Sequence, residues 1–569
     1  MTAGPVEFFQ DPPRLANTFA ADAALRETLE RLLPADVHAA LLPEWRELGQ
    51  AASGELAALA RDAEVDPPRH IPYDAWGRRV DEVRLSPAWR ALHGEAARRG
   101  LAAIPYEPAR GAWGRLHQFA LLALFGPSSA VYTCPLAMTD GAARTLLTHA
   151  GDDLVRRVVP HLTSRDPDQL WTSGQWMTER AGGSDVSGTA TIARRDGALW
   201  RLWGTKWFTS AVTSEVALTL ARPEGAPAGS AGLSLFLVEQ RAADGTRNRI
   251  RVLRLKDKLG THALPTAELA LEGAAAEAVG ALGQGVKKIA PLLNITRLHN
   301  AVSACGMMAR LLQLLRDHAR RRVAFGSPLA AKTLHRETLA GLQVEYEAAL
   351  ALTFDCARLL GKVEAGEASE DERALLRLLT PLCKLLTARQ AVAVASEALE
   401  GFGGAGYVED TGLPVWLRDA QVLPIWEGTT NVLSLDALRA MHRDGVLEPW
   451  TALATRRLDA LASSPLADLA AVVRRRVAGV RAAVSALTAP GPEQAESVAR
   501  RIALSLAGLS AAVALCEQGA WAPAHGRGER ASMAARRWVG ERLPELPAAG
   551  EVAARLADSA VLSGLAEPG

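Results

Sequence analysis

A single carboxylate, Glu427, lies in residues 424–431, which read PIWEGTTN. An apolar Pro-Ile-Trp run precedes it, and a glycine and two threonines follow it, so this stretch is too irregular for the interior of a helix. Burial disfavours the charged form of a carboxylate and raises its pKa, which makes it a better base near neutral pH. The pattern alone does not say why an acid lies here, and the rest of the sequence must answer that question.

A glycine-rich segment, residues 401–406 (GFGGAG), has the GxGxxG spacing of a dinucleotide-binding loop, and Glu427 lies where an acid could contact the ribose. Such a loop needs a strand before the glycines and a helix after them. Here the helical stretch ARQAVAVASEALE precedes, and YVEDTGLP, with a turn and a proline, follows. We therefore reject the dinucleotide interpretation and expect these glycines to end a helix and to let the chain pass close to a flat or charged group.

Three further patterns each have a chemical and a purely structural explanation. Residues 175–189 (QWMTERAGGSDVSGT) could hold a phosphate through backbone N–H groups and a hydroxyl, or form a plain tight turn. Residues 204–211 (GTKWFTSA) could present an aromatic face and a hydroxyl to a planar cofactor, or simply pack in a strand. Residues 320–329 (RRRVAFGSPL) place cations and a capping glycine at a helix C-terminus, which helix electrostatics alone would explain.

Other site classes find no support in the sequence. The 12 histidines are scattered without a HxH or HExxH pair, so no metal site is predicted. A GxSxG elbow and a Walker loop are also absent from the sequence, which disfavours a hydrolase or a nucleotide triphosphatase.

The bulk composition narrows the class of protein. A chain of 569 residues is too long for one core and suggests about three or four domains. The 64 basic and 63 acidic residues leave a net charge of +1, so no global field attracts nucleic acid or an anionic membrane. The 5 cysteines are isolated and never spaced as CxxC, which argues against disulfides and favours a reducing compartment. With no leader-like N-terminus and no long uncharged apolar run, we expect a cytoplasmic protein without membrane insertion.

The elements that must position these residues fall into four regions. Residues 1–170 show helical spacing of apolar residues, as in DDLVRRVVPHL, and predict an N-terminal helical domain. Residues 171–285 contain short β-branched or aromatic runs between turn signals and predict a central antiparallel β domain. Residues 286–445 return to helical periodicity and predict a helical bundle of four-helix type, and residues 446–569 predict an extra helical extension. The fold class is therefore α+β and mostly α.

The C-terminal extension is rich in arginine and contains no lysine. From residue 451 to the end it has fourteen arginines and eleven acidic residues, a formal charge of +3. The arginines cluster at 456–457, 474–476, 500–501 and 536–537. Such clusters could hold phosphates along one face, as in DNA binding, but arginine pairs on amphipathic helices are more often a solvated face or an oligomer contact.

The order of the motifs is more specific than any one of them. Helices, then MTE with GGSD, then KWFTS, then RxxFG, and then FGGxGY, RDA and IWEGTTN follow one another in this chain. From about residue 101 to residue 441 this order resembles the flavin-dependent acyl-CoA dehydrogenases. The wording GQWMTERAGGSDVS, the segment KDKLGTHALPTAEL and the long extension are similar to the AidB-like branch and its long-chain relatives.

The resemblance implies a role for each matching residue around bound FAD. Met177 and Thr178 would lie along the flavin ring, Ser184 would bind the pyrophosphate, Trp207 would lie against the isoalloxazine, and Thr209 would bond near N5. Arg322 and Phe325 would reach the adenine half of FAD in a neighbouring subunit, and Gly403 and Gly404 would meet the pyrophosphate of another chain. Thr429 is a further expected cofactor contact. Sharing the cofactor in this way implies a homotetramer.

The resemblance also assigns the chemistry. Glu427 would remove the α-proton of an acyl-CoA thioester while the β-hydride passes to flavin N5, with Arg297 close to the carboxylate. The developing enolate would be stabilised by the backbone N–H of Glu427 and a ribityl hydroxyl. Asn294 stands where many dehydrogenases have an aspartate, so their contacts to CoA do not transfer directly.

The expected reaction is the α,β-desaturation of a medium- to long-chain acyl-CoA, with electron-transfer flavoprotein as the electron acceptor. Two alternatives remain open: an AidB-like flavoprotein that protects DNA and has weak dehydrogenase activity, and a flavoprotein that sequesters acyl lipids. Acyl-CoA oxidases share the architecture, but the chain ends in AEPG without a peroxisomal signal, which disfavours oxygen as the acceptor.

Overall fold

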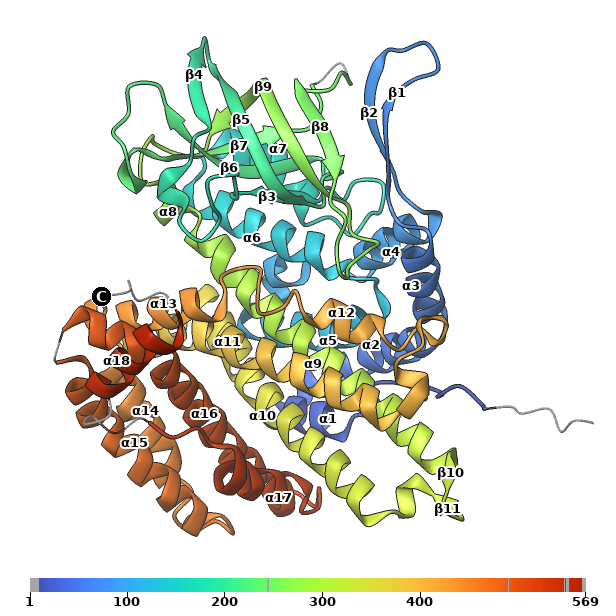
Figure 1. The fold of residues 1–569 in the computed structure, drawn as a ribbon, viewed down its shortest axis with the longest axis vertical. Coiled ribbons are helices and arrows are strands. Elements are labelled where there is room, and N and C mark those ends of the chain that lie inside the picture. Colours follow the sequence, from blue (N-terminus) through green and yellow to red (C-terminus); the bar gives the residue numbers. More distant parts are fainter. Residues whose placement is uncertain (1–9, 243–244, 490, 547, 549–551, 565–569) are drawn as a thin grey trace, which may run out of the picture.

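The computed structural model describes residues 10–242, 245–489, 491–546, 548 and 552–564 (Figure 1). The first nine residues and the last five, on which the expectations about targeting signals rest, lie outside the described residues. The described chain consists of a helical N-terminal part, a β domain, a helical bundle and a helical extension, as predicted.

The N-terminal part is a set of seven helices with one hairpin. The helices are α1 (Ala23–Leu32), α2 (Ala35–Ser53), α3 (Glu55–Val65), α4 (Pro87–Arg98), α5 (Gly114–Phe125), α6 (Thr133–His149) and α7 (Asp152–Leu162). The last of these is the predicted DDLVRRVVPHL helix. The hairpin of β1 (Arg69–Tyr73) and β2 (Arg79–Arg84) was not predicted, because its strands are short and rich in charge, and it projects beside the β domain (Figure 1).

The β domain holds seven strands, β3 (Ser173–Trp176), β4 (Ile192–Asp196), β5 (Leu199–Ser210), β6 (Val216–Pro223), β7 (Ser234–Glu239), β8 (Ile250–Leu255) and β9 (Thr266–Ala278). Four of these strands, β5, β6, β7 and β8, coincide with the aromatic and β-branched runs from which strands were predicted. Most pairings are antiparallel, but β3 and β4 both run parallel to β6, so the sheet is mixed. The pairings β6–β7, β7–β9, β9–β5, β5–β4 and β4–β6 close the strands on themselves.

Long helices after the β domain form the bundle. The long helices are α9 (Ala290–Arg321), α10 (Thr333–Glu364) and α11 (Glu370–Gly401). The shorter helices are α8 (Gly285–Lys288), which precedes α9, and α12 (Val415–Ala420) and α13 (Thr430–Arg443), which follow α11. A small hairpin of β10 (Val323–Ala324) and β11 (Ser327–Pro328) joins α9 to α10. Ser369 and Glu372 form a capping box that starts α11, which runs directly up to Gly401. Because a helix and not a strand precedes the glycine segment, the rejection of the dinucleotide loop is confirmed.

The extension contains α14 (Leu447–Asp459), α15 (Ala467–Thr488), α16 (Pro492–Ala524), α17 (Arg530–Arg537) and α18 (Val552–Leu562). Helix α15 ends at Thr488, and α16 begins at Pro492. The buried helix α16 packs against α10, α11 and α13, so the extension shares one hydrophobic core with the bundle (Figure 1). Two helices, α11 and α16, are long and apolar enough to cross a membrane, and 83% of the apolar window of each is buried in the fold, as in core helices.

Candidate active site

The turn between α12 and α13 carries Glu427. Residues 421–428 form no helix or strand, and both Glu427 and Gly428 have a positive φ, of 56° and 99°. A non-glycine residue in this left-handed region is uncommon and costs conformational energy, so surrounding contacts must hold it. Thr429 ends the turn as the N-cap of α13, where its side chain accepts a hydrogen bond from the N–H of Val432.

The carboxylate of Glu427 is half-buried and faces helix α9. The hydroxyl of Thr296 lies 2.8 Å from Glu427 Oε2 and 3.0 Å from the carbonyl oxygen of Leu292. A hydroxyl has one proton to donate and two lone pairs that accept. The Thr296 hydroxyl can therefore donate its proton to the ionised carboxylate of Glu427. When the carboxylate is protonated, the hydroxyl can instead donate to the carbonyl oxygen of Leu292 and accept a hydrogen bond from the acid.

A chain of ion pairs anchors this turn to the bundle. Arg297 Nε lies 3.4 Å from the carbonyl oxygen of Glu427, and its Nη1 lies 2.8 Å from Asp436 on α13. Arg377 of α11 binds the other oxygen of Asp436 at 2.9 Å. Arg297 therefore lies beside Glu427, but it contacts the backbone carbonyl, and its ion pair is with Asp436.

Burial is the main influence on Glu427 and raises the pKa of its carboxyl above the ordinary value. Hydrogen bonding from Thr296, the charges of Arg297 and Lys384, and the side chain of Gln175 act in the opposite direction. The net upward shift brings the group closer to neutral pH, as the sequence predicted for a base.

The predicted flavin residues of the β domain are adjacent in the structure. The N–H of Trp207 donates to the carbonyl oxygen of Thr178 at 2.9 Å, which joins the KWFTS strand to the MTE segment. Met177 is buried and the Trp207 ring is half-buried. Thr209 is buried, and its hydroxyl donates to Ala267 at 2.6 Å, so the proposed bond near N5 would require this hydroxyl to turn. Ser184 is exposed in a turn beside glycines 182 and 183.

An ion pair that sequence reasoning missed holds these two segments together. Glu179 of the MTE motif lies 2.7 Å from Lys206 Nζ of the KW motif, and both side chains are buried. Glu179 also accepts from the N–H of Ala190 at 2.7 Å. The acid and the lysine of these motifs are therefore structural partners that place the neighbouring residues.

The residues present fit a planar cofactor. A cavity of about 370 Å³ opens beside residues 255–258 and 262–266, and one of its lining side chains, Lys256, places Nζ 3.5 Å from the Trp207 ring centroid. Two buried polar atoms near the base, Gln175 Oε1 and Trp426 Nε1, have no hydrogen-bond partner within the described part of the chain. A Cβ on Gly183 would lie 2.8 Å from Thr178 Oγ1. Only a glycine at position 183 therefore lets this turn pack so closely against Thr178. A compact turn and polar atoms without a partner among the described residues are features that a bound cofactor would use.

The residues expected to serve a neighbouring subunit lie at the surface of this chain. Phe325 is 95% exposed at the tip of the β10–β11 hairpin, and Arg322 lies at its base. Gly403 and Gly404 are exposed just after α11, and a Cβ at either would meet open space. Gly403 has φ 65°, which favours glycine. Their contacts with a second copy of the chain stay a prediction.

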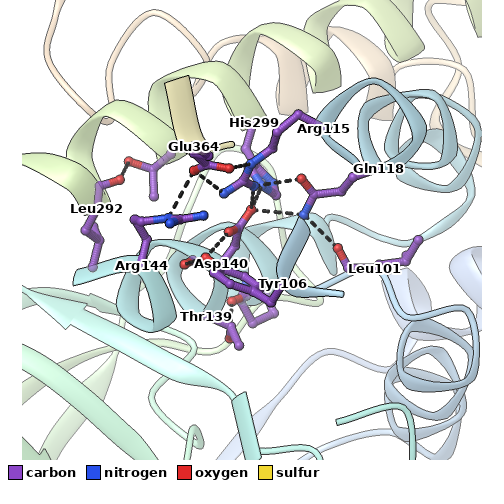
Figure 2. A network of polar contacts seen from close by, with 12 residues as sticks. Leu101, Tyr106, Arg115, Gln118, Thr139, Asp140, Arg144, Leu292, His299 and Glu364 are labelled. Carbon is purple, nitrogen blue, oxygen red and sulfur yellow. Dashed lines mark hydrogen bonds and ion pairs between the residues drawn. The ribbon is translucent and has the colours of Figure 1, made fainter. Parts of the chain in front are cut away.

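A buried polar network orients helix α9 one turn beyond Thr296 (Figure 2). Asp140 of α6 binds Arg115 of α5 at 2.5 Å and His299 of α9 at 2.8 Å. Arg115 also binds Glu364 of α10 through both Nε and Nη2, at 2.6 and 2.8 Å. The neighbouring cations hold the pKa of Asp140 well below its usual range against the effect of burial. The network links four helices and fixes the rotation of α9, and with it the face that carries Thr296 and Arg297.

Three family models match this chain. The model of the adaptive response protein AidB N-terminal domain matches residues 10–169, that of the acyl-CoA dehydrogenase middle domain residues 174–274, and that of the acyl-CoA dehydrogenase C-terminal domain residues 283–442.

Individual proteins and solved structures are similar over most of the chain. Acyl-CoA dehydrogenase family member 11 of Caenorhabditis elegans is 44% identical over 518 residues, 88% of this chain and 84% of the relative. Putative acyl-CoA dehydrogenase AidB of Escherichia coli (strain K12) is 34% identical over 442 residues, 76% of this chain and 79% of the relative. The crystal structure of Caenorhabditis elegans ACDH-11 in complex with C11-CoA has a TM-score of 0.95 and 40% identity, and the match covers 100% of this chain and 98% of that one. The structure of Bd2924 in its apo form has a TM-score of 0.84 and 48% identity, covering 90% and 100%.

Proposed function

This chain belongs to the acyl-CoA dehydrogenase family, and on that premise we propose that Glu427 is the base in the α,β-desaturation of a medium- to long-chain acyl-CoA. The observation that carries the proposal is the half-buried Glu427 carboxylate, which is held 2.8 Å from Thr296 in a left-handed turn. The similar ACDH-11 structure was solved with C11-CoA, which supports a chain of this length class.

The residues of this chain supply proton transfer and orientation. Glu427 takes a proton from the α-carbon, the electron pair of that bond forms the new double bond, and a hydride leaves the β-carbon. FAD, the cofactor of this family, supplies the acceptor for that hydride when bound. Thr296 first donates to the ionised carboxylate and then accepts from the acid that forms, while Arg297 holds the carbonyl of the same residue. Exclusion of water strengthens each of these interactions.

Met177, Thr178, Ser184, Trp207, Thr209 and Thr429 would hold the cofactor within one chain. The half-buried ring of Trp207 and its backbone link to Thr178 support this. Gln175, whose Oε1 has no partner among the described residues, would accept a hydrogen bond from a donor on the cofactor.

We further propose a homotetramer in the cytoplasm that passes electrons to an electron-transfer flavoprotein. Phe325 and Tyr407 are 95% and 91% exposed, and Val323 and Val408 near them are also exposed. Large apolar side chains rarely gather at a free surface, so a second copy that covers them is the simplest explanation. Arg322, Gly403 and Gly404 would then meet the cofactor of that copy.

The DNA-binding alternative draws less support from the described part of the extension. Several clustered arginines are engaged within the chain: Arg457 with Asp355 and Glu517, Arg536 with Asp468, and Arg474 with Asp459. An ion-paired arginine is a weaker phosphate ligand, because the new contact must replace the old one. DNA binding through the exposed 474–476 cluster predicts an affinity that falls steeply with salt and is lost when these charges are removed.

The direct test is anaerobic addition of acyl-CoAs of graded chain length to the holoenzyme while the flavin absorbance is followed. We expect bleaching that is fastest for medium or long chains and that slows by about 10²–10⁴-fold in Glu427→Gln. Glu397→Gln, an exposed residue on α11, is the matched control and should bleach like the wild type. A Glu427→Gln enzyme that bleaches normally would remove Glu427 from the role of base, and a wild type that never bleaches would favour the lipid-sequestering or DNA-associated alternative.

A further inference from the structure

Lys384, in the middle of α11, is a fully buried lysine with an unusual environment. Its ammonium donates to the carbonyl oxygen of Gly428 at 2.7 Å, and the side chain has 0% exposure. The other fully buried lysine, Lys206, is neutralised by Glu179 at 2.7 Å. Lys384 has no carboxylate within ion-pair distance among the described residues. A buried charge without a direct counter-ion carries a large desolvation free energy, so a function of Lys384 next to the Glu427 turn would explain its presence.

The position of Lys384 relative to the base supplies that reason. Glu427 and Gly428 are consecutive residues with positive φ, and a cation holds the carbonyl of each: Arg297 that of Glu427 and Lys384 that of Gly428. Such a strained turn keeps its shape only if neighbouring groups determine both peptide planes. Lys384 is also within electrostatic range of the Glu427 carboxylate, although the two do not form a direct ion pair.

We propose that Lys384 is a positioning residue for the base: it fixes the left-handed turn through Gly428, and its positive charge favours the ionised carboxylate of Glu427. This rests on the proposed role of Glu427 as the base. The charged groups that face Lys384 are Glu427 from the turn and Arg297 from α9, and Asp436 of α13 is already bound by Arg297 and Arg377.

The arrangement has a distinctive dependence on pH. Burial lowers the pKa of Lys384 to about 7, which the charge of Glu427 partly opposes. Below that pH the ammonium is charged and stabilises the ionised carboxylate of Glu427. Above that pH the amine is neutral, and this stabilisation is lost. Loss of Lys384 should therefore slow proton removal most on the acidic side, and the difference from the wild type should shrink as the pH rises.

The test compares Lys384→Met, which removes both the charge and the donor, with Lys384→Gln, which removes the charge and keeps an N–H donor for Gly428. Titration of Glu427 is read directly from its carboxylic acid C=O band by infrared difference spectroscopy, assigned by its absence in Glu427→Gln. Flavin reduction by acyl-CoA is measured over the same pH range. We expect both variants to raise the titration midpoint by about one pH unit and to slow reduction about tenfold at acidic pH. Only Lys384→Met should also slow reduction at alkaline pH, because the turn has lost its anchor.

The possible results separate this inference from the proposed function. If Glu427→Gln is inactive and both lysine variants keep the wild-type midpoint and rate, the role of Lys384 is refuted while the base survives. If Glu427→Gln remains active, the proposed base itself is wrong. If Lys384→Met does not fold, Lys384→Gln alone decides, and an unchanged midpoint in it refutes the electrostatic effect.

Discussion

Removal of the Thr296 hydroxyl should shift the pH dependence of the reaction. Thr296→Val replaces a hydroxyl that lies 2.8 Å from Glu427 Oε2 with a methyl group of nearly the same size. A hydrogen bond to a charged group contributes about 1.5–3 kcal/mol, which corresponds to a pKa change of about 1–2 units. The bond to the ionised carboxylate is charge-assisted and stronger than the bond that the hydroxyl can accept from the protonated acid, so its loss adds to the effect of burial and raises the pKa of Glu427 further.

The helix itself should tolerate this change. The other acceptors within reach of the hydroxyl are the carbonyls of Leu292 and Leu293, four and three residues earlier on α9, and both stay within the helix. Thr296→Ser keeps the hydroxyl and is the matched control. Both variants should therefore unfold at nearly the same temperature, and a change in the reaction can be assigned to the bond with Glu427.

The assay is the rate of flavin reduction by saturating acyl-CoA, measured anaerobically by stopped flow across a pH series. We expect the acidic limb of the profile to move upward by about 1–2 pH units in Thr296→Val and to stay near the wild type in Thr296→Ser. An acidic limb that is the same in Thr296→Val and the wild type would refute the argument that this hydroxyl tunes the base.

Two further predictions concern stability. Burial raises the pKa of Asp419 to about 7, so the folded state holds its proton more tightly than the unfolded chain, and stability falls as the pH rises from about 4 to about 7. Asp419→Asn keeps an acceptor for the N–H of Thr261. Because the side chain is only partly buried, the free energy of unfolding should rise by roughly 1–2 kcal/mol at about pH 8 and change little at about pH 4, as measured by denaturant titration. Equal effects at both pH values would contradict this. Arg457→Met removes one of the two arginines that pair with Asp355 and one of the two that pair with Glu517, at 2.6 and 2.7 Å. The change should cost about 2–4 kcal/mol in the same titrations, whereas the exposed control Arg475→Met should cost almost nothing. The neighbouring arginines hold the pKa of Asp355 well below its usual range, against the effect of burial. The cost of Arg457→Met should therefore begin to fall once the pH drops below about 4 and should vanish only well below that pH, where Asp355 is protonated in the folded protein as well; a cost independent of pH would argue against the ion pair.

Local sequence patterns predicted several of the helices and strands. Helical periodicity over residues 152–162 and the aromatic run at 199–210 match α7 and β5 in their bounds, because amphipathic spacing and β-branched or aromatic content are properties of the segment itself. The central strand β9, TAELALEGAAAEA, was not singled out, because its alanines have little strand propensity and its stability comes from pairing with β5, β7 and β8. The parallel pairing of β3 and β4 with β6 has no local signal at all.

The sequence by itself determined the family and the irregular turn that carries Glu427, because motif order and turn residues are written along the chain. Only the tertiary structure decided what surrounds that carboxylate. Thr296 and Lys384 lie 131 and 43 positions away from residue 427, on helices whose periodicity is the same whether or not they face a base. Which side of each helix meets the turn depends on long-range contacts such as Arg115–Asp140–His299, and these form only when distant segments fold together.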